Sequence, residues 1–190
     1  MRATGMEVRE AIESRRAYRS LDPVEVTDEL IRDLAECASL SASCFNNQPW
    51  RFVFVRDPDV LKEMHSALSR GNEWIHNASM IIAVFSSPED DCRIKGRIYH
   101  HFDVGMATAF LILRATELGL VAHPIAGYRE KRVKAVLGIP ENIQVITLVN
   151  VGRHSETVLD SLSDQQKEWE RVRPERLPFE EFAYIDRYKG

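Results

Sequence analysis

The chain has 190 residues, 28% of them charged, with a formal net charge of −4 and a pI of about 5.9. This length is enough to bury a sizeable core and predicts a single domain over residues 1–190. The acidic balance argues against a nucleic-acid partner, which usually requires a basic face. The most apolar stretch, residues 102–113, is far shorter than the roughly 20 residues that span a bilayer, so we expect no membrane partner.

The N-terminus and the cysteines favour a cytoplasmic protein. Residues 1–16 lack the apolar core of a signal peptide. The three cysteines, Cys37, Cys44 and Cys92, show no CxxC pairing, and their number is odd. We therefore expect reduced thiols rather than a disulfide framework.

Two helices and a strand are predicted in the first third of the chain. Apolar residues at helical spacing over 8–12 predict a first helix that ends in the run 15–19. Thr27 is a candidate N-cap for a second helix. The buried stripe of that helix comprises Leu30, Ile31, Leu34, Cys37 and Ala38. Residues 50–55 are mostly aromatic and β-branched, which predicts a strand.

The middle of the chain predicts a helix, a buried strand and then the longest helix. Asp57 and the proline after it form an N-cap and first helical position for a helix to about Leu68. The continuous apolar run 80–85 has the length of a strand and predicts a central one. Residues 99–118 form the longest helix, which Gly119 closes with a left-handed cap.

The longest predicted helix is apolar nearly all round between residues 102 and 113. Such a helix must be covered on every side. In a chain of this length, we expect another subunit to cover the outer face, where Gly105 and Ala109 allow close approach. The alternative is a central helix that is wholly covered within one monomer.

The last third of the chain completes an α+β fold. Residues 121–125 form a short segment, 130–137 a helix closed by Gly138, and 144–151 a strand. The tail, RPERLPFEEFAYIDRY, has prolines and scattered aromatics without helical period, which predicts an extended C-terminal arm. Together these elements predict a mixed β-sheet flanked by helices, in a homodimer.

Familiar catalytic motifs are absent from the sequence. It contains no GxGxxG after a strand, no GxxxxGK[ST], no HExxH and no GxSxG. His100 and His101 lie about 100° apart on a helix and do not converge, although His100 and Asp103 share a face. A solvated or capping role is favoured for this cluster, and we expect no metal site. Cys44 has no histidine beside it in its loop, which favours an unreactive thiol over a nucleophile.

A cluster of arginines follows the first predicted helix. Arg15, Arg16 and Arg19 place up to three guanidinium groups at one helix end. Arg15 and Arg19 are four residues apart, so on a helix they share a face and can contact one anion. The planar guanidinium fork suits phosphate. The alternative is a solvated cationic helix C-terminus, which the helix dipole favours.

The loop before the predicted strand 50–55 is rich in amides. Its polar members include Ser43, Asn46, Asn47 and Gln48. Their side chains offer donors and acceptors without charge, which suits the edge of a neutral heteroaromatic ring. The alternative is a polar turn, where these residue types are common. An arginine-held phosphate with an amide-bound heterocycle indicates a mononucleotide-like cofactor, from which the protein would take its chemistry.

Four segments, ESRRAYRSLDP, SASCFNNQPWRF, HPIAGY and ERLP, resemble in order those of the FMN-dependent nitroreductase family. They span nearly the whole chain, and the RRxxR and NxQPW signatures are fairly specific in combination. The resemblance implies an α+β homodimer with FMN at its interface. It also implies hydride transfer from NADH or NADPH to flavin N5, and then to a small electron-poor acceptor such as a nitroaromatic or a quinone.

The resemblance assigns cofactor-binding positions residue by residue. It implies phosphate and ribityl contacts at the N-terminal arginines, ring contacts from the amide loop (residues 42–48) of the other subunit, and a segment over N5 at residues 124–127. The implied cofactor-binding residues are Arg15, Arg16, Ala17, Arg19, Ser43, Cys44, Asn46, Gln48, Asn72, Pro124, Ile125, Ala126, Gly127 and Arg176, with Arg173 as a second C-terminal clamp. No catalytic side chain is implied, because the flavin carries the chemistry.

Two positions depart from the family pattern. Ala17 stands where many members have serine, so only a backbone contact is implied there. Ala126 stands where many nitroreductases have glutamate, which bears on substrate positioning. The short polar stretch 86–99 favours a compact, open site. The alternatives are a flavin-dependent dehydrogenase or oxidase of another small substrate, a flavin-binding redox sensor without turnover, and a dimeric scaffold with a surface arginine cluster.

Overall fold

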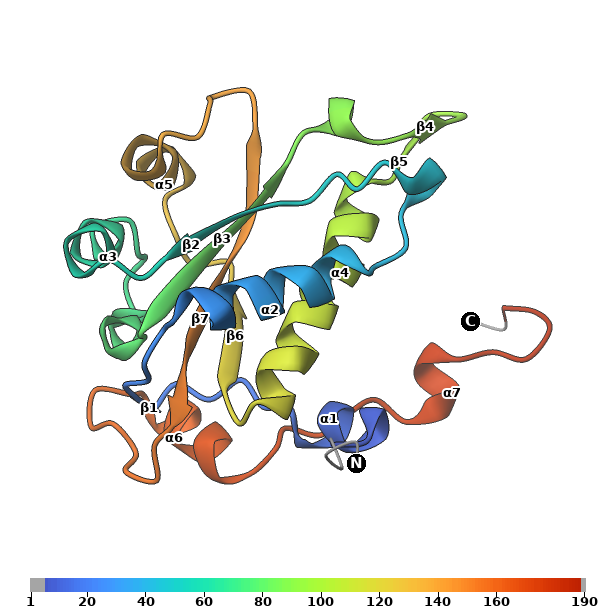
Figure 1. Cartoon of the computed structure of the whole chain (residues 1–190). Helices are drawn as coiled ribbons and strands as arrows, with labels where there is room; N and C mark the ends of the chain where they lie inside the picture. The colour runs from blue at the N-terminus through green and yellow to red at the C-terminus, as the bar shows by residue number, and fades with distance from the viewer. Residues whose placement is uncertain (1–5, 189–190) are drawn as a thin grey trace, which may run out of the picture.

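The protein folds as a β-sheet with helices on both faces, and the computed structural model describes residues 6–188 (Figure 1). The strands are β1 (Leu21–Asp22), β2 (Arg51–Val55), β3 (Met80–Ser86), β4 (Arg93–Ile94), β5 (Arg97–Ile98), β6 (Val121–Ile125) and β7 (Gln144–His154). The helices are α1 (Val8–Ser14), α2 (Asp28–Ser39), α3 (Pro58–His65), α4 (His100–Glu117), α5 (Glu130–Leu137), α6 (Asp164–Arg171) and α7 (Phe179–Phe182). The 3-10 helices are η1 (Cys44–Asn46), η2 (Glu73–Asn77) and η3 (Pro88–Asp90).

The main sheet has the strand order β1-β7-β3-β2, and β6 also pairs with β7. Strands β4 and β5 form a separate hairpin. Every pairing among the described strands is antiparallel, so the expectation of a mixed sheet is wrong. The apolar run of β3 does not distinguish the two cases, because any strand covered on both faces is apolar throughout.

β3 lies between two hydrophobic cores, which confirms the predicted buried central strand. Ile81 and Ala83 belong to the core that includes residues of α3 and α5. Met80, Ile82 and Val84 belong to the core that includes residues of α2 and α4. Successive side chains of a strand point to opposite faces, so both sets must be apolar. Burial of each aliphatic side chain stabilises the fold by about 1.5–3 kcal/mol.

Several predicted helix boundaries are confirmed. The Thr27 hydroxyl accepts the backbone N–H of Leu30 at 3.2 Å, and Asp57 caps the start of α3 in the same way. Gly119 follows α4 with φ of 73°, and Gly138 closes α5 with φ of 68°. These signals act within a few residues, which explains why they can be recognised without the fold.

The first helix is shorter than expected. α1 ends at Ser14, and residues 15–20 are not helical. The prediction that Arg15 and Arg19 share one helical face is therefore wrong. The carboxylate of Glu170 accepts the backbone N–H of Arg19 at 2.8 Å. This bond to a distant residue replaces a helical hydrogen bond, and it holds the segment away from the helix.

Residues 6–188 leave part of the outer face of α4 uncovered. Phe102 is 63% exposed and Phe110 is 44% exposed. Gly105 and Ala109 are also exposed, whereas Leu111 on the inner face is fully buried. The alternative of a helix wholly covered within one monomer is therefore wrong. Cover by a second subunit stays a prediction.

The chain after β7 runs over the surface. The sequence pattern did not predict α6, which begins with a capping box of Ser163 and Gln166. Residues 172–188 contain only the short helix α7, are mostly exposed, and run past α1 away from the sheet (Figure 1). Their contact with another subunit stays a prediction. Within residues 6–188, no helix combines the length and apolar character that crossing a membrane requires.

Candidate functional site

Five arginines from the two ends of the chain line one cavity of about 330 Å³, here called the arginine cavity. Three of them follow α1, and two follow α6. The complete lining is Arg15, Arg16, Ala17, Arg19, Trp169, Arg173, Pro174 and Arg176. The structure therefore brings the predicted N-terminal and C-terminal arginines together, although it does not do so on a helix.

Glu170 positions the N-terminal side of the arginine cavity. This residue is only 6% exposed, and its carboxylate accepts the backbone N–H groups of Arg19 at 2.8 Å and Ser20 at 3.0 Å. The carbonyl of Ser20 in turn accepts the N–H of Ser155 at 2.9 Å, beside the pairing of β1 with β7. The segment that carries the arginines is thus bonded to both α6 and the end of the sheet.

Guanidinium groups of the segment after α1 bind the backbone of α6, and those of the segment after α6 bind the backbone after α1. Arg173 Nη2 donates to the carbonyl of Arg15 at 2.8 Å, and Arg16 Nη2 donates to the carbonyl of Trp169 at 2.6 Å. The Arg19 guanidinium lies 5.5 Å from the centroid of the Trp169 ring, within range of a cation–π interaction. These contacts join α6 and the segment after it to the segment after α1.

The positive charge in the arginine cavity has no salt-bridge partner in the described part of the chain, since none of the five arginines pairs with a carboxylate there. Burial lowers the pKa of Arg15 from its usual value, and the neighbouring arginines, Arg173 first, lower this pKa further. Phosphate would relieve the repulsion and accept several planar guanidinium forks, so the residues present fit the phosphate of FMN.

The end of β6 and the residues after it, 124–127, form a second group of predicted residues together with Asn72. Pro124 and Ala126 are exposed, whereas Ile125 between them is buried. The amide of Asn72 donates to the carbonyl of Gly127 at 3.0 Å. A Cβ atom at position 127 would lie 2.2 Å from that amide nitrogen, so this contact requires glycine. The predicted residues of this group are therefore in contact.

His123 lies between the arginine cavity and this group, and sequence reasoning gave it no role. It is 7% exposed, its Nδ1 lies 3.0 Å from the carbonyl of Tyr18, and its ring centroid is 4.7 Å from that of Trp74. Burial lowers the pKa of His123 to about 4, so the ring is neutral at neutral pH. Because a carbonyl only accepts, Nδ1 carries the proton. The one available signal was a histidine within a buried strand.

The amide loop is a tight turn with internal hydrogen bonds. The Ser43 hydroxyl accepts the N–H of Gln48 at 3.0 Å, and the Gln48 side chain donates to the carbonyl of Asn46 at 3.2 Å. Phe45, Asn46 and Gln48 have φ of 49°, 59° and 50°. The left-handed conformation costs a residue other than glycine about 1–2 kcal/mol. Trp50 is buried and anchors the end of the loop.

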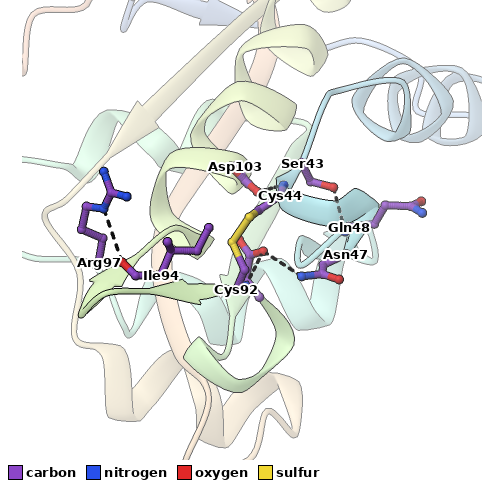
Figure 2. The surroundings of a disulfide bond; sticks show 9 residues. Ser43, Cys44, Asn47, Gln48, Cys92, Ile94, Arg97 and Asp103 are labelled. Atoms are coloured by element: carbon purple, nitrogen blue, oxygen red, sulfur yellow. Dashed lines mark hydrogen bonds between the residues drawn. A yellow bond between two sulfur atoms is a disulfide. The ribbon is translucent and has the colours of Figure 1, made fainter.

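Cys44 forms a disulfide bond with Cys92 (Figure 2). The expectation of reduced thiols is therefore wrong for this pair, whereas Cys37 is free. The two half-cystines are 48 positions apart in the sequence, and their Cα atoms are 6.1 Å apart. The segment before the β4–β5 hairpin meets the amide loop, which no sequence spacing reveals. The expected cytoplasmic location loses the support that three free thiols lent it.

His100 and Asp103 are buried rather than solvated. A solvated or capping role is the expectation from the sequence, and because each residue is 2% exposed, the solvated role is wrong for both. Asp103 Oδ2 accepts the backbone N–H of Cys44 at 2.6 Å, and burial raises the pKa of this carboxyl. Among the described residues, the only cluster with the spacing of metal ligands is Cys44, Asp91 and Cys92, and its two sulfur atoms are bonded to each other.

A single chain does not bring all the predicted residues together. The amide loop lies beside the N-terminal end of α4, where Ser43 and Cys44 line a second cavity of about 310 Å³ with Phe102 and Met106. The arginine cavity adjoins α1, toward the other end of that helix (Figure 1). The 18 residues of α4 extend over about 27 Å. The two groups are therefore well separated within the monomer.

Several relatives resemble this chain in sequence. A protein of Archaeoglobus fulgidus named NADH dehydrogenase/NAD(P)H nitroreductase is 36% identical over 147 residues, which cover 74% of this chain and 82% of that protein. A Thermus thermophilus protein named NADH dehydrogenase is 24% identical over 182 residues, which cover 80% of this chain and 88% of that protein.

Solved structures share the fold, and the sequence matches a family. A structure described as an oxidoreductase containing FMN has a TM-score of 0.83 at 28% identity, covering 95% of this chain and 92% of that one. A structure from Exiguobacterium sibiricum, solved with FMN, has a TM-score of 0.79 at 19% identity, covering 97% and 99%, and shows the fold alone. The sequence model of the nitroreductase family matches residues 12–73 and 62–153. The chain therefore belongs to the nitroreductase family.

Proposed function

We propose that this protein is an FMN-dependent oxidoreductase that uses NADH or NADPH to reduce small electron-poor acceptors, such as nitroaromatics or quinones. The observation that carries the proposal is the arginine cavity, in which five guanidinium groups gather without a carboxylate partner among the described residues. Membership of the nitroreductase family supports it. When bound, FMN would supply hydride transfer at N5, and the protein would supply binding and orientation.

The arginine cavity would hold the FMN phosphate. Arg15 and Arg19 are half-buried, and their guanidinium groups form no salt bridge within residues 6–188. Arg16 uses one nitrogen on one backbone carbonyl, and Arg173 uses one nitrogen on the carbonyls of Glu13 and Arg15. A guanidinium has five N–H donors, so each keeps others free. Arg176 is exposed at the rim. The cavity can therefore bind phosphate while the contacts that join its two walls stay intact.

The end of β6 and an amide loop would hold the ring. Pro124 and Ala126 are exposed on the same side of the chain, so a flat ring can lie against them. Ser43, Asn46 and Gln48 would contact the polar edge of the ring through their uncharged groups. No side chain in residues 124–127 titrates, which favours small neutral acceptors over charged substrates that need an ion pair.

We propose that a second copy of the chain completes the site. The amide loop and the arginine cavity lie toward opposite ends of α4, and the outer face of that helix is apolar and exposed at Phe102 and Phe110. Two such helices packed antiparallel across a two-fold axis exchange their ends. The amide loop of each subunit would then lie near the arginine cavity of its partner. Burial of this apolar face would stabilise the pair.

Spectroscopy of the purified protein tests the proposed function. A yellow protein, or one that gains a perturbed flavin spectrum when mixed with FMN, is the expected result. NADH or NADPH should then bleach the bound flavin under anaerobic conditions, and nitroaromatics or quinones should restore its colour with turnover. Failure to bind FMN would refute the proposal. Binding without bleaching would instead support a dehydrogenase or oxidase, and bleaching without turnover would support a redox sensor.

A further inference from the structure

The Cys44–Cys92 disulfide ties the amide loop to the segment before β4 (Figure 2). Two other polar contacts hold the loop to its surroundings here. The Cys44 N–H donates to Asp103 at 2.6 Å, and the Asn47 side chain donates to Asp91 at 3.3 Å. The second of these bonds is long, and it reaches the residue next to Cys92. The disulfide is therefore the covalent part of a small anchor for the loop.

The amide loop needs such an anchor because its backbone is strained. Phe45, Asn46 and Gln48 all have positive φ, and Phe45 is 83% exposed, so its side chain gains little from packing. Strained backbone persists only where surrounding contacts hold it. The loop is thus expected to relax when one of its contacts is removed.

The disulfide is also placed for exchange with thiols. Cys44 and Cys92 are both partly exposed. One carboxylate oxygen of Asp91 and the two sulfur atoms lie within 4.8 Å of one another. Asp91 Oδ2 is buried and has no hydrogen-bond partner among the described residues. A carboxyl group is therefore close enough to exchange a proton with a departing thiolate, directly or through one water.

We propose that Cys44–Cys92 is a redox-active site for thiol–disulfide exchange with a dithiol, and that its reduction releases the amide loop. The Asp91 carboxylate accepts the proton of one thiol of the dithiol, and the thiolate so formed attacks one sulfur. The Cys44–Cys92 bond breaks, a mixed disulfide forms, and the other cysteine leaves as a thiolate. The second thiol of the dithiol then displaces the bound cysteine. Two electrons and two protons pass from the dithiol to the protein, which leaves two cysteine thiols and an oxidised dithiol. Asp91 returns the proton that it took from the attacking thiol to the departing cysteine thiolate.

One consequence rests on the proposed function. If the amide loop holds the flavin ring, its release weakens FMN binding, so the dithiol balance of the surroundings controls how much of the protein carries cofactor. The exchange chemistry and the release of the loop do not depend on flavin. The two parts can therefore be tested separately.

Thiol trapping tests the exchange. The native protein is equilibrated with mixtures of reduced and oxidised dithiothreitol, trapped with a maleimide and analysed by peptide mass spectrometry. Labels on Cys44 and Cys92 should appear together as the mixture becomes more reducing, without denaturant. A Cys37→Ser variant is the matched control and should behave identically at this pair. Labelling only after unfolding would overturn the proposal.

Hydrogen exchange tests the release of the loop. Reduction should speed amide exchange in residues 42–48 by about tenfold or more, because the segment loses a tertiary restraint. Cys92→Ser should reproduce this effect without reductant, whereas Cys37→Ser should not. Unchanged exchange in the reduced protein would overturn the release.

Two further measurements separate the roles. If Asp91 carries the proton, Asp91→Asn should slow reduction by dithiothreitol about tenfold or more. The fraction of the Cys44–Cys92 pair that is reduced at equilibrium should change little. An unchanged rate would remove Asp91 from the mechanism. FMN affinity should fall about tenfold or more in the reduced protein, through loss of ring contacts. Failure of both the oxidised and the reduced protein to bind FMN would refute the proposed function. Thiol trapping and hydrogen exchange would still test whether Cys44–Cys92 is redox-active.

Discussion

Replacing Arg15 by glutamine should separate cofactor binding from protein stability. Arg15 lies half-buried in the arginine cavity, and its guanidinium forms no salt bridge with any described residue. The carbonyl that accepts Arg173 belongs to its backbone, so it survives the substitution. The lowered pKa of Arg15 means that the folded apoprotein disfavours this charge. We therefore expect the unfolding midpoint of the apoprotein to stay the same or rise.

FMN binding should change in the opposite direction. A hydrogen bond to a charged group contributes about 1.5–3 kcal/mol, and its loss at the phosphate is the main effect expected. Each 1.4 kcal/mol changes the dissociation constant tenfold, so the Kd for FMN should rise about 10- to 150-fold. The four other arginines of the cavity would keep the site cationic, so binding should weaken without being abolished.

Flavin fluorescence titration at fixed ionic strength measures the Kd, and circular dichroism measures the unfolding midpoint of the apoprotein. Arg153→Gln is the matched control, because Arg153 is exposed, lies outside the arginine cavity and carries the same charge. A Kd within about twofold of the unchanged protein, inside ordinary mutational scatter, would refute the phosphate assignment. An equal loss of affinity in Arg153→Gln would show that only the overall charge matters.

Three other predictions concern stability. Gly127→Ala should destabilise the protein by about 0.5–1.5 kcal/mol and lower its melting temperature, because the Asn72 side chain must rotate away from the new Cβ and lose its hydrogen bond to the carbonyl of residue 127. Asn72→Ala, which removes the same hydrogen bond, should lose about as much. No loss in the single variant would contradict this packing. The Cys44–Cys92 bond joins residues 48 positions apart, so its loss in Cys92→Ser should lower the free energy of unfolding by up to about 4 kcal/mol. Guanidinium titration measures this change, with Cys37→Ser as the control. Equal stabilities of the two variants would contradict the prediction. The pKa of His123 is lowered to about 4, so the unfolded chain binds a proton first as pH falls. The free energy of unfolding should therefore decline by about 3 kcal/mol between pH 6.5 and 4, and His123→Gln should remove that decline. A variant with the same pH profile as the unchanged protein would contradict this prediction.

Local signals in the sequence determined much of the secondary structure. Thr27 and Asp57 start helices where predicted, and Gly119 and Gly138 end them. Each signal depends on hydrogen bonds or backbone angles within a few residues, so it holds whatever the rest of the chain does. The apolar run of β3 likewise predicted a strand covered on both faces, although it carried no information on strand direction.

Long-range contacts set the arrangement of the candidate site. Residues 15–20 leave the helix because Glu170, about 150 positions away, binds their backbone. That same contact brings the N-terminal arginines beside Arg173 and Arg176. The sequence supplied the residue types, since guanidinium groups and amides suit a phosphate and a heterocycle wherever they lie.

In the amide loop too, composition was informative, whereas conformation depends on long-range contacts. Its composition predicted a recognition role, which stays a proposal, but its three positive φ angles and the disulfide depend on Cys92, Asp91 and Asp103. Such contacts join segments far apart in the chain, and no local periodicity encodes them. The chemical groups that are available, and the places where most helices and strands form, could be read from the sequence. Which of those groups meet could not, because long-range packing and hydrogen bonds outweigh local preference there.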